Sequence, residues 1–402
     1  MTRHSTFRTT TIHPYGDVVQ VPWVTNCDHL WERSRLEWRV GDRGDPAKLV
    51  ADFLASYGLK PLSTPPSVTF SDHTITDICG ATLLLSAAAG AVIAGAPGSS
   101  GRPSPAPAVP DLVVIVYAHR GAAAGEVEPA AAGEWWLGEW SPSWSATEHA
   151  DAVRSVRSAI ARGDVYQVNV VGHASAPYLG DPLPALRRAA GLPGARYTGV
   201  VRGDGYALAC ASPETLVRVR SRTVETRPIK GTRPATPSGR RELLASAKER
   251  AEHIMIVDLS RNDLARVART GTVTVPELFR LRRWCDLWQA ESCVTAELAD
   301  GVDLATLLRA VCPGGSVTGE PKLAALAQLT ALEPVGRGPS MGALGWVDGA
   351  GLDLGLTIRT VAADGDRLHL WAGGGITWDS DPDEEVAEAA AKAAPLRAAL
   401  AG

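Results

Sequence analysis

The sequence has 402 residues, of which 45% are hydrophobic and 21% charged, and its formal net charge is −4. This balance is typical of a soluble globular protein, and without a basic block of five or six residues neither nucleic acid nor an anionic membrane surface is expected as a partner. The N-terminus, MTRHSTFRTTTIHPYGDV, has no apolar core and no small-residue cleavage site, so it is not expected to be a secretory signal.

Residues 1 to about 145 alternate short apolar runs with loops. The uncharged stretch Ile78–Ala96 is long enough for a membrane helix, but it is mostly Ala and Gly and is followed by Gly, Ser and Pro, so we expect a buried strand or two instead. Residues 97–110 (PGSSGRPSPAPAVP) predict an exposed connection. The run DLVVIVYAH from Asp111 predicts a buried strand, and WWLGEWSPSWS predicts an irregular link.

From about Glu148 the apolar pattern becomes denser. One helical face, ending at Gly163, is predicted to carry Ala152, Val153, Val156, Ile160 and Ala161. Strands are predicted for VYQVNVVGHAS, YALACAS, TLVRVRS and TVETRPI. A long helix, ERAEHIMIVDLSRNDLARVA, precedes the strand GTVTV, and EEVAEAAAKAAPLRAALA predicts a terminal helix. Strands and helices do not alternate as βαβ units, so a mainly antiparallel α+β fold is favoured over a doubly wound parallel sheet.

The six cysteines are scattered, and none forms a C-x-x-C pair. This spacing argues against a disulfide framework or a zinc site and favours buried thiols in a reducing cytoplasm. The residues are Cys27, Cys79, Cys210, Cys285, Cys293 and Cys312.

Two acidic pairs are candidates for a metal site. Glu249 and Glu252 lie three residues apart on one predicted helix, and Glu385 and Glu388 have the same spacing on the last helix. Members of each pair share a helix face. Four carboxylates converging from two helices would form a hard-oxygen site suited to Mg²⁺, although solvated acidic pairs at this spacing are common.

Two glycine-rich segments, 312–322 (CPGGSVTGEPK) and 371–380 (WAGGGITWDS), lack the spacing of a phosphate loop. Tight strand turns are the favoured interpretation, and exposed glycine amides that bind a carboxylate are the alternative. Lys230 lies in RPIKGTRP, at a predicted strand end. It is a nucleophile only if burial or a neighbouring cation changes its protonation, and its immediate neighbours do not decide this.

Nine ordered segments between residues 148 and 400 together resemble the chorismate-utilising enzymes, which include anthranilate, aminodeoxychorismate, isochorismate and salicylate synthases. They are GDVYQVN (163–169), SPE (212–214), PIKGTRP (228–234), EHIMIVDLSRNDLARV (252–267), GGSVTGEPK (314–322), LEPVGRG (332–338), LTIRT (356–360), AGGGITWDSDP (372–382) and the terminal E-x-x-E-x-x-x-K.

The resemblance implies one large α+β domain with two stacked, mainly antiparallel sheets in a sandwich surrounded by helices. Residues 1–145 would be an N-terminal segment that completes the sandwich, and 146–402 the chorismate-binding catalytic region. The resemblance also implies Mg²⁺ held against a substrate carboxylate. Its direct ligands would be Glu252 and Glu388, and its water-mediated ligands Glu249 and Glu385.

Further roles also come from the resemblance. Glu214 is the expected general acid that protonates the departing C4 hydroxyl. Arg359, with amides near Gly374, is the expected clamp on the enolpyruvyl carboxylate. The remaining expected substrate contacts are Ser316, Thr232, Lys392, Gln167 and Gln289.

Two positions select the expected reaction. Members of the family that add water have a lysine base where this sequence has Gln167, and Gln cannot take a proton from water. Anthranilate synthases resemble PIAGT where this sequence has PIKGT, which matches aminodeoxychorismate synthases. We therefore expect amination of chorismate to 4-amino-4-deoxychorismate through a covalent intermediate on Lys230.

The sequence departs from the family pattern at Gln289, where a pocket histidine is usual, at Ser340, where an aromatic residue is usual, and at Glu320, where alanine is usual. The sequence has no LLES-like segment near its N-terminus, so feedback inhibition by tryptophan is not supported. Without a fused glutaminase, ammonia is expected from a separate glutamine amidotransferase subunit. Anthranilate synthase, 2-amino-2-deoxyisochorismate synthase and a non-catalytic chorismate-binding paralogue are the alternatives.

Overall fold

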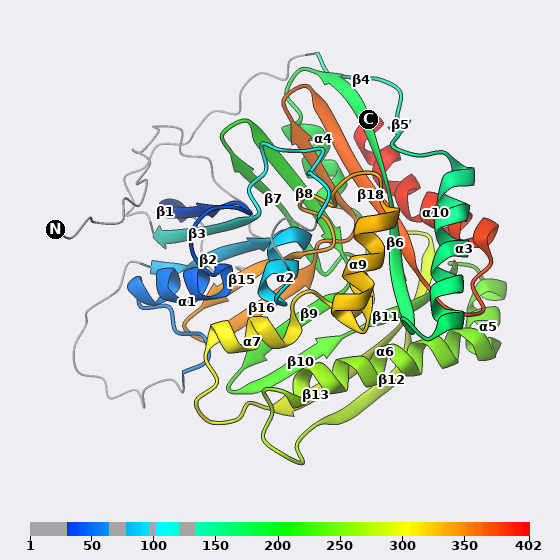
Figure 1. The fold of residues 1–402 in the computed structure, drawn as a ribbon. Coiled ribbons are helices and arrows are strands. Elements are labelled where there is room, and N and C mark those ends of the chain that lie inside the picture. Colours follow the sequence, from blue (N-terminus) through cyan, green and yellow to red (C-terminus); the bar gives the residue numbers. More distant parts are fainter. Residues whose placement is uncertain (1–29, 64–77, 97–100, 120–133) are drawn as a thin grey trace.

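The computed structural model describes residues 30–63, 78–96, 101–119 and 134–402, which form two antiparallel sheets and the helices around them (Figure 1). The N-terminal segment, for which no secretory signal is expected, and Cys27 lie outside the described residues. Among the described cysteines, Cys210, Cys285, Cys293 and Cys312 are free thiols. No helix within the described residues is both long and apolar enough to cross a membrane.

The first sheet joins strands from both ends of the chain. Its described strands follow the order β1-β3-β2-β15-β16-β9-β10-β13-β11, and β12 also pairs with β13. The bounds are β1 (Leu30–Trp38), β2 (Ile78–Leu85), β3 (Leu112–His119), β9 (Thr215–Arg220), β10 (Thr223–Arg227), β11 (Ile229–Pro234), β12 (Thr274–Trp284), β13 (Leu287–Glu297), β15 (Ala343–Asp348) and β16 (Gly351–Leu356).

The second sheet has the order β14-β6-β18-β17-β8-β7 among its described strands, and two short strands, β4 and β5, pair with β6. The bounds are β4 (Trp136–Leu137), β5 (Ser141–Pro142), β6 (Gln167–Leu179), β7 (Tyr197–Gly203), β8 (Tyr206–Ser212), β14 (Gly319–Glu320), β17 (Thr360–Asp364) and β18 (Arg367–Ile376).

The main hydrophobic core lies between the two sheets. On β8, Leu208 and Cys210 belong to the same buried cluster as Leu83 and Val217 of the first sheet. Ala207 and Ala209 alternate with them and pack into a second cluster under helices. Because successive side chains of a strand point to opposite faces, a strand covered on both sides has a continuous apolar sequence, as YALACAS does. The predicted mainly antiparallel sandwich is confirmed. The division at residue 145 stays a prediction.

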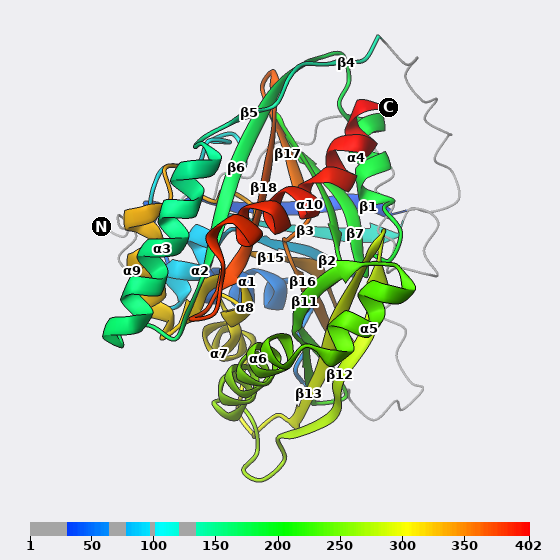
Figure 2. The same cartoon turned by 90° about the vertical axis from the view of Figure 1, so that its right-hand side faces the viewer.

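Helices cover the outer faces and edges of the sheets. Figure 2 shows α10 crossing the second sheet, and α6 beside β11 and β12 of the first sheet. The bounds are α1 (Pro46–Ser56), α2 (Ala87–Ile93), α3 (Ala146–Arg162), α4 (Leu183–Ala190), α5 (Pro237–Ala245), α6 (Ala247–Ala265), α7 (Leu304–Val311), α8 (Gly315–Thr318), α9 (Lys322–Leu332) and α10 (Pro382–Ala401).

Local signals explain where α3 begins and ends. Ser145 and Glu148 form a reciprocal capping box, and Gly163 ends the helix with φ of 80°, where only glycine is unstrained. The predicted apolar face is confirmed at Ala152, Val153 and Val156. Ala161 is exposed, and Ala159 is buried in its place, because the helix turns Ala159 toward β6.

Three expectations for loops and strands are corrected. Ile78–Ala96 forms the expected buried strand, β2, but it continues as the helix α2, which Ser86 caps, and not as a second strand. Residues 101–110 form a connection, but Ala106 and Val109 are buried, since Arg39 binds the carbonyls of residues 107–109 and holds the connection on the protein. The segment 312–322 contains α8 rather than a strand turn.

Candidate active site

A cavity of about 540 Å³ lies between α6, α10, β11 and β18. Its volume lies within the range of small-molecule sites. Most of the predicted site residues line it, namely Glu214, Lys230, Thr232, Glu249, Glu252, Gln289, Ser316, Arg359, Glu385, Glu388 and Lys392. Gln167 and Gly374 are not part of the lining, although their neighbours Gly373 and Gly375 are.

Lys230 projects from β11 at a bulge. Gly231, the next residue, has φ of 78° and interrupts the pairing of β11 with β13. A side chain on Gly231 would also meet Glu249, with only 2.9 Å from its Cβ to Oε2. The bulge turns the strand locally. The Nζ of Lys230 lies 3.5 Å from the carbonyl oxygen of Gly375 on β18.

The glycines of AGGG lie within β18, paired with β6, and not in a turn. None of Gly373, Gly374 and Gly375 has a positive φ, so they are not needed for a turn conformation. A Cβ on Gly375 would lie 2.1 Å from the Nζ of Lys230, and one on Gly374 would lie 2.8 Å from Oε2 of Glu385. Their lack of side chains therefore makes room for site residues.

Glu214 follows β8 and is buried. Its Oε1 accepts a hydrogen bond of 2.6 Å from the hydroxyl of Ser316 on α8. Burial raises the pKa of Glu214 to about 7, and the bond from Ser316 and the charges of Lys230 and Arg359 oppose that rise. A carboxyl group with this pKa can be protonated near neutral pH and can donate a proton.

Arg359 is buried and has φ of 54°, an uncommon backbone conformation for arginine. Its guanidinium lies over the Trp284 ring, 4.6 Å from the centroid, and its Nε has no hydrogen-bond partner. Burial lowers its pKa to about 10, against the charges of Glu388 and Glu214. A forked cation with a free donor at the cavity wall suits a carboxylate ligand.

The four predicted metal ligands line the cavity from two helices, Glu249 and Glu252 from α6 and Glu385 and Glu388 from α10. Each has a partner in the protein. Arg233 pairs with Glu249 at 2.8 Å, Thr377 donates to Glu252 at 2.8 Å, Ser380 donates to Glu385 at 2.7 Å, and Lys392 pairs with Glu388 at 2.9 Å.

The pKa values of these carboxyls differ with their neighbours. Burial raises the pKa of Glu249, with Arg233 opposing and Glu252 and Glu388 adding to the rise. Burial and the charge of Glu388 raise the pKa of Glu385. Burial also acts to raise the pKa of Glu388, but Lys392, Lys230 and the hydroxyl of Thr232 outweigh it and hold that pKa at about 2. Glu388 is therefore a carboxylate at neutral pH.

The donor chemistry of this cluster fits Mg²⁺. Its donors are oxygens only, and Mg²⁺ keeps several waters and takes few protein ligands. Within the described residues, no three His, Cys, Asp or Glu side chains come close enough together to hold a metal by themselves. The four-ligand site therefore stays a prediction.

Three further positions were singled out in the sequence. Gln167 is fully buried beside Gly375, and neither of its amide atoms has a hydrogen-bond partner. Gln289 lies opposite Thr232 on the neighbouring strand and lines the cavity. Ser340 is buried and donates to the carbonyl of Thr357.

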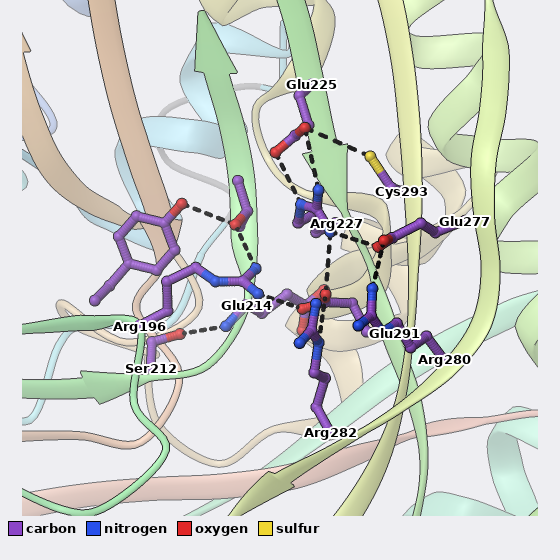
Figure 3. A network of polar contacts seen from close by, with 12 residues as sticks. Arg196, Ser212, Glu214, Glu225, Arg227, Glu277, Arg280, Arg282, Glu291 and Cys293 are labelled. Atoms are coloured by element: carbon purple, nitrogen blue, oxygen red, sulfur yellow. Dashed lines mark hydrogen bonds and ion pairs between the residues drawn. The ribbon is translucent and has the colours of Figure 1, made fainter.

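A network of charges that sequence reasoning missed lies beside Glu214 (Figure 3). The buried carboxylate of Glu291 on β13, opposite Ile229 of β11, pairs with Arg196, Arg227 and Arg282. Such pairs are costly to break once buried. The network thus fixes the strands next to Lys230. The available signal was a glutamate within the apolar run of β13.

A family model described as chorismate binding enzyme matches residues 114–398, starting upstream of the resemblance seen in the sequence. The chain is 39% identical over 256 residues to aminodeoxychorismate synthase component 1 of Klebsiella aerogenes, with 62% of this chain and 57% of the relative covered. It is 39% identical over 270 residues to anthranilate synthase component 1 of Streptomyces coelicolor, with 65% and 53% covered.

The chain spans somewhat more than half the length of these two relatives. Among solved structures, anthranilate synthase component I from Streptococcus pneumoniae aligns with a TM-score of 0.73 at 22% identity, covering 98% of this chain and 95% of that one. At this identity the likeness shows the fold alone.

Proposed function

This chain belongs to the chorismate-binding enzyme family, and from that premise we propose that it converts chorismate and ammonia to 4-amino-4-deoxychorismate. The observation that carries the proposal is that Lys230, a primary amine, and Glu214, a carboxyl with a pKa of about 7, line one cavity. A nucleophile and an acid are the two groups that a double displacement needs.

In the first step the neutral amine of Lys230 attacks C2 of chorismate. A C2–N bond forms, the two ring double bonds shift toward C4, and the C4–O bond breaks. Glu214 gives its proton to the departing hydroxyl, which leaves as water. Hydroxide is a poor leaving group, and protonation removes that barrier.

In the second step ammonia attacks C4. The C4–N bond forms, both ring double bonds shift back, and the C2–N bond to Lys230 breaks, which returns the free amine. The proton lost by the ammonia nitrogen passes to the carboxylate of Glu214 and restores the acid. Two displacements place the nitrogen at C4, whereas one direct attack would place it at C2.

The other lining residues bind and orient the substrate. Arg359, with its free donor, holds a carboxylate, and Lys392 and Thr232 keep Glu388 ionised. Mg²⁺ would be held by Glu252 and Glu388 directly and by Glu249 and Glu385 through water. When bound, it would neutralise the substrate's ring carboxylate and fix its position.

Anthranilate synthesis is the second candidate. It is favoured by the anthranilate synthase relative, whose identity of 39% equals that of the aminodeoxychorismate synthase relative. Lys230 argues against it, because direct amination at C2 needs no enzyme nucleophile.

Product identification tests the proposal. The pure chain is incubated with chorismate, Mg²⁺ and an ammonium salt, and the product is identified by mass and retention time. The 4-amino isomer is expected. Anthranilate as the main product would refute the proposal.

A further inference from the structure

The segment LEPVGRG contains a buried ion pair that the proposed reaction does not use. Arg337 and Glu333 have side chains that are only 10% and 6% exposed. Arg337 donates two hydrogen bonds to the carboxylate of Glu333, from Nε at 2.8 Å and from Nη2 at 2.6 Å. Neither residue lines the cavity.

This pair joins two elements that do line the cavity. Arg337 donates from Nη1 to the carbonyl of Val317 on α8 at 2.6 Å, and from Nη2 to the carbonyl of Asn169 on β6. Glu333 accepts from the amide of Val171, also on β6, at 3.0 Å. The pair therefore connects α8 with β6.

The short helix α8 has one residue that touches the acid. Ser316, next to Val317, donates to Glu214. The position of α8 therefore sets the position of the Ser316 hydroxyl. Arginine suits this connection because its rigid, planar fork binds the carboxylate with two nitrogens while it donates to both carbonyls, whereas the three donors of a lysine rotate about a single nitrogen.

Stability alone is a weak reason for such a pair. Removing two charges from water costs about as much as their attraction returns, and well-packed apolar residues often stabilise as much. Because Arg337 also donates to backbone carbonyls of two elements, the pair fixes the position of those elements relative to each other.

We propose that the Glu333–Arg337 pair is a positioning device that holds Ser316 against Glu214, so that the general acid is oriented for proton transfer. The proposal rests on the acid role of Glu214 in the proposed function, and not on the identity of the product. Arg337 acts through Ser316 and does not touch the substrate.

A double-mutant cycle on chorismate consumption with ammonium tests this. Arg337→Lys should lower kcat about tenfold or more with little change in KM. In a Ser316→Ala background Arg337→Lys should lower kcat by less than about threefold. The effects of two residues that act through one another on kcat are not additive. If Arg337→Lys lowers kcat by the same factor with Ser316 present and with Ser316→Ala, the proposal is overturned.

Arg222→Lys is the matched control. Arg222 also donates to two backbone carbonyls, those of Leu298 and Ala299, and to the carboxylate of Asp300, and none of these residues lines the cavity. Arg222→Lys should leave kcat unchanged. If Arg337→Lys does not fold, Glu333→Gln weakens the same pair and takes its place in the cycle.

A titration of Glu214 separates this proposal from the proposed function, because it needs no turnover. The carboxyl is followed by ¹³C NMR in glutamate-labelled protein and assigned with Glu214→Gln. Ser316→Ala and Arg337→Lys should both raise its pKa, since the bond from Ser316 favours the carboxylate. The groups facing Glu214, namely Lys230, Arg359 and Asp263, are unchanged in both variants. An unchanged pKa in Arg337→Lys would overturn the proposal whatever the product is.

Discussion

The side-chain nitrogen of Lys230 lies 3.5 Å from the carbonyl oxygen of Gly375, a residue 145 positions further along the chain. This contact joins the PIKGT and AGGG segments, and it connects β11, at the edge of the first sheet, with β18 in the interior of the second. Any side chain on Gly375 would occupy the position of the amine, because its Cβ would lie 2.1 Å from Nζ. The glycine therefore defines where the proposed nucleophile lies.

Gly375→Ala should displace Lys230 and lower turnover at least about tenfold. The fold should tolerate the change, because the nearest atoms are the ends of the flexible side chains of Lys230 and Gln167, so the free energy of unfolding should change by less than about 1 kcal/mol. Steady-state kinetics and urea unfolding measure the two effects. Gly349→Ala, at a position with no atom within 4 Å, is the control. Full activity in Gly375→Ala would contradict the proposed position of the nucleophile.

The pKa of Glu214 predicts how activity depends on pH. A general acid must be protonated, and burial raises its pKa to about 7. The acid therefore predicts a falling limb, in which kcat/KM for chorismate decreases as the pH rises through about 7. The profile is measured at a constant concentration of free ammonia, because the ammonium equilibrium itself changes with pH.

Glu214→Gln should remove this pH dependence and lower kcat by about 10²- to 10⁴-fold. Glu242→Gln, on the exposed side of α5, should behave as the wild type. A falling limb that persists in Glu214→Gln would assign the acid to another group.

The candidate site shows which features a sequence can predict. Lys230 and Glu252 were found from short segments, because each motif is local in the chain. The glycines of AGGG were interpreted as a turn, since glycine usually supplies a positive φ, whereas here they allow the close approach of side chains from other elements. That reason depends on contacts across 145 positions.

The charge network and the ion pair illustrate the same limit. Glu291 pairs with Arg196, just before β7, and with Arg227 of β10. Arg337 binds the carbonyl of Asn169, 168 positions away. A buried charge is stable only with its partners in place, and its neighbours in sequence do not identify them. Such residues are recognised only when the folded arrangement is known.

Glu252→Gln and Glu388→Gln should each abolish activity and leave the fold intact. Both replacements keep the size of a cavity-lining side chain and remove one charge that Mg²⁺ requires. Turnover as a function of Mg²⁺ concentration and calorimetric Mg²⁺ titration measure the effect, and circular dichroism checks the fold. Asp258→Asn is the control, since Asp258 is exposed on the same helix as Glu252. Near-normal turnover of either Gln variant at limiting Mg²⁺ would refute the ligand assignment.

The proposed partner predicts which nitrogen source the chain can use alone. With glutamine as the only source the isolated chain should form no aminated product, because an amide nitrogen must first be released by an amidotransferase. Ammonium at alkaline pH should restore the reaction. Mass spectrometry with ¹⁵N-labelled glutamine or ammonium identifies the source of the nitrogen. Labelled product from glutamine and this chain alone would rule out the need for a separate subunit.

Lys230→Ala decides between the two proposed reactions. The change removes the nucleophile but keeps Glu214, Arg359 and the carboxylates of α6 and α10. The variant should therefore still bind chorismate yet lose formation of the 4-amino product by about 10²-fold or more, with any residual amination at C2. Substrate binding by calorimetry and product analysis measure the two outcomes, and Lys48→Ala, exposed on α1, is the control.

The covalent step can be observed directly in the wild type. When ammonia is withheld, the first displacement proceeds and the second cannot, so the adduct of chorismate less water should accumulate on Lys230. Peptide mass spectrometry after rapid quenching locates the added mass, and adding ammonium before the quench should remove it. Because the adduct needs the acid as well as the amine, it should be absent from Glu214→Gln and from Lys230→Ala. Undiminished 4-amino product from Lys230→Ala would show that the amine has no part in the chemistry.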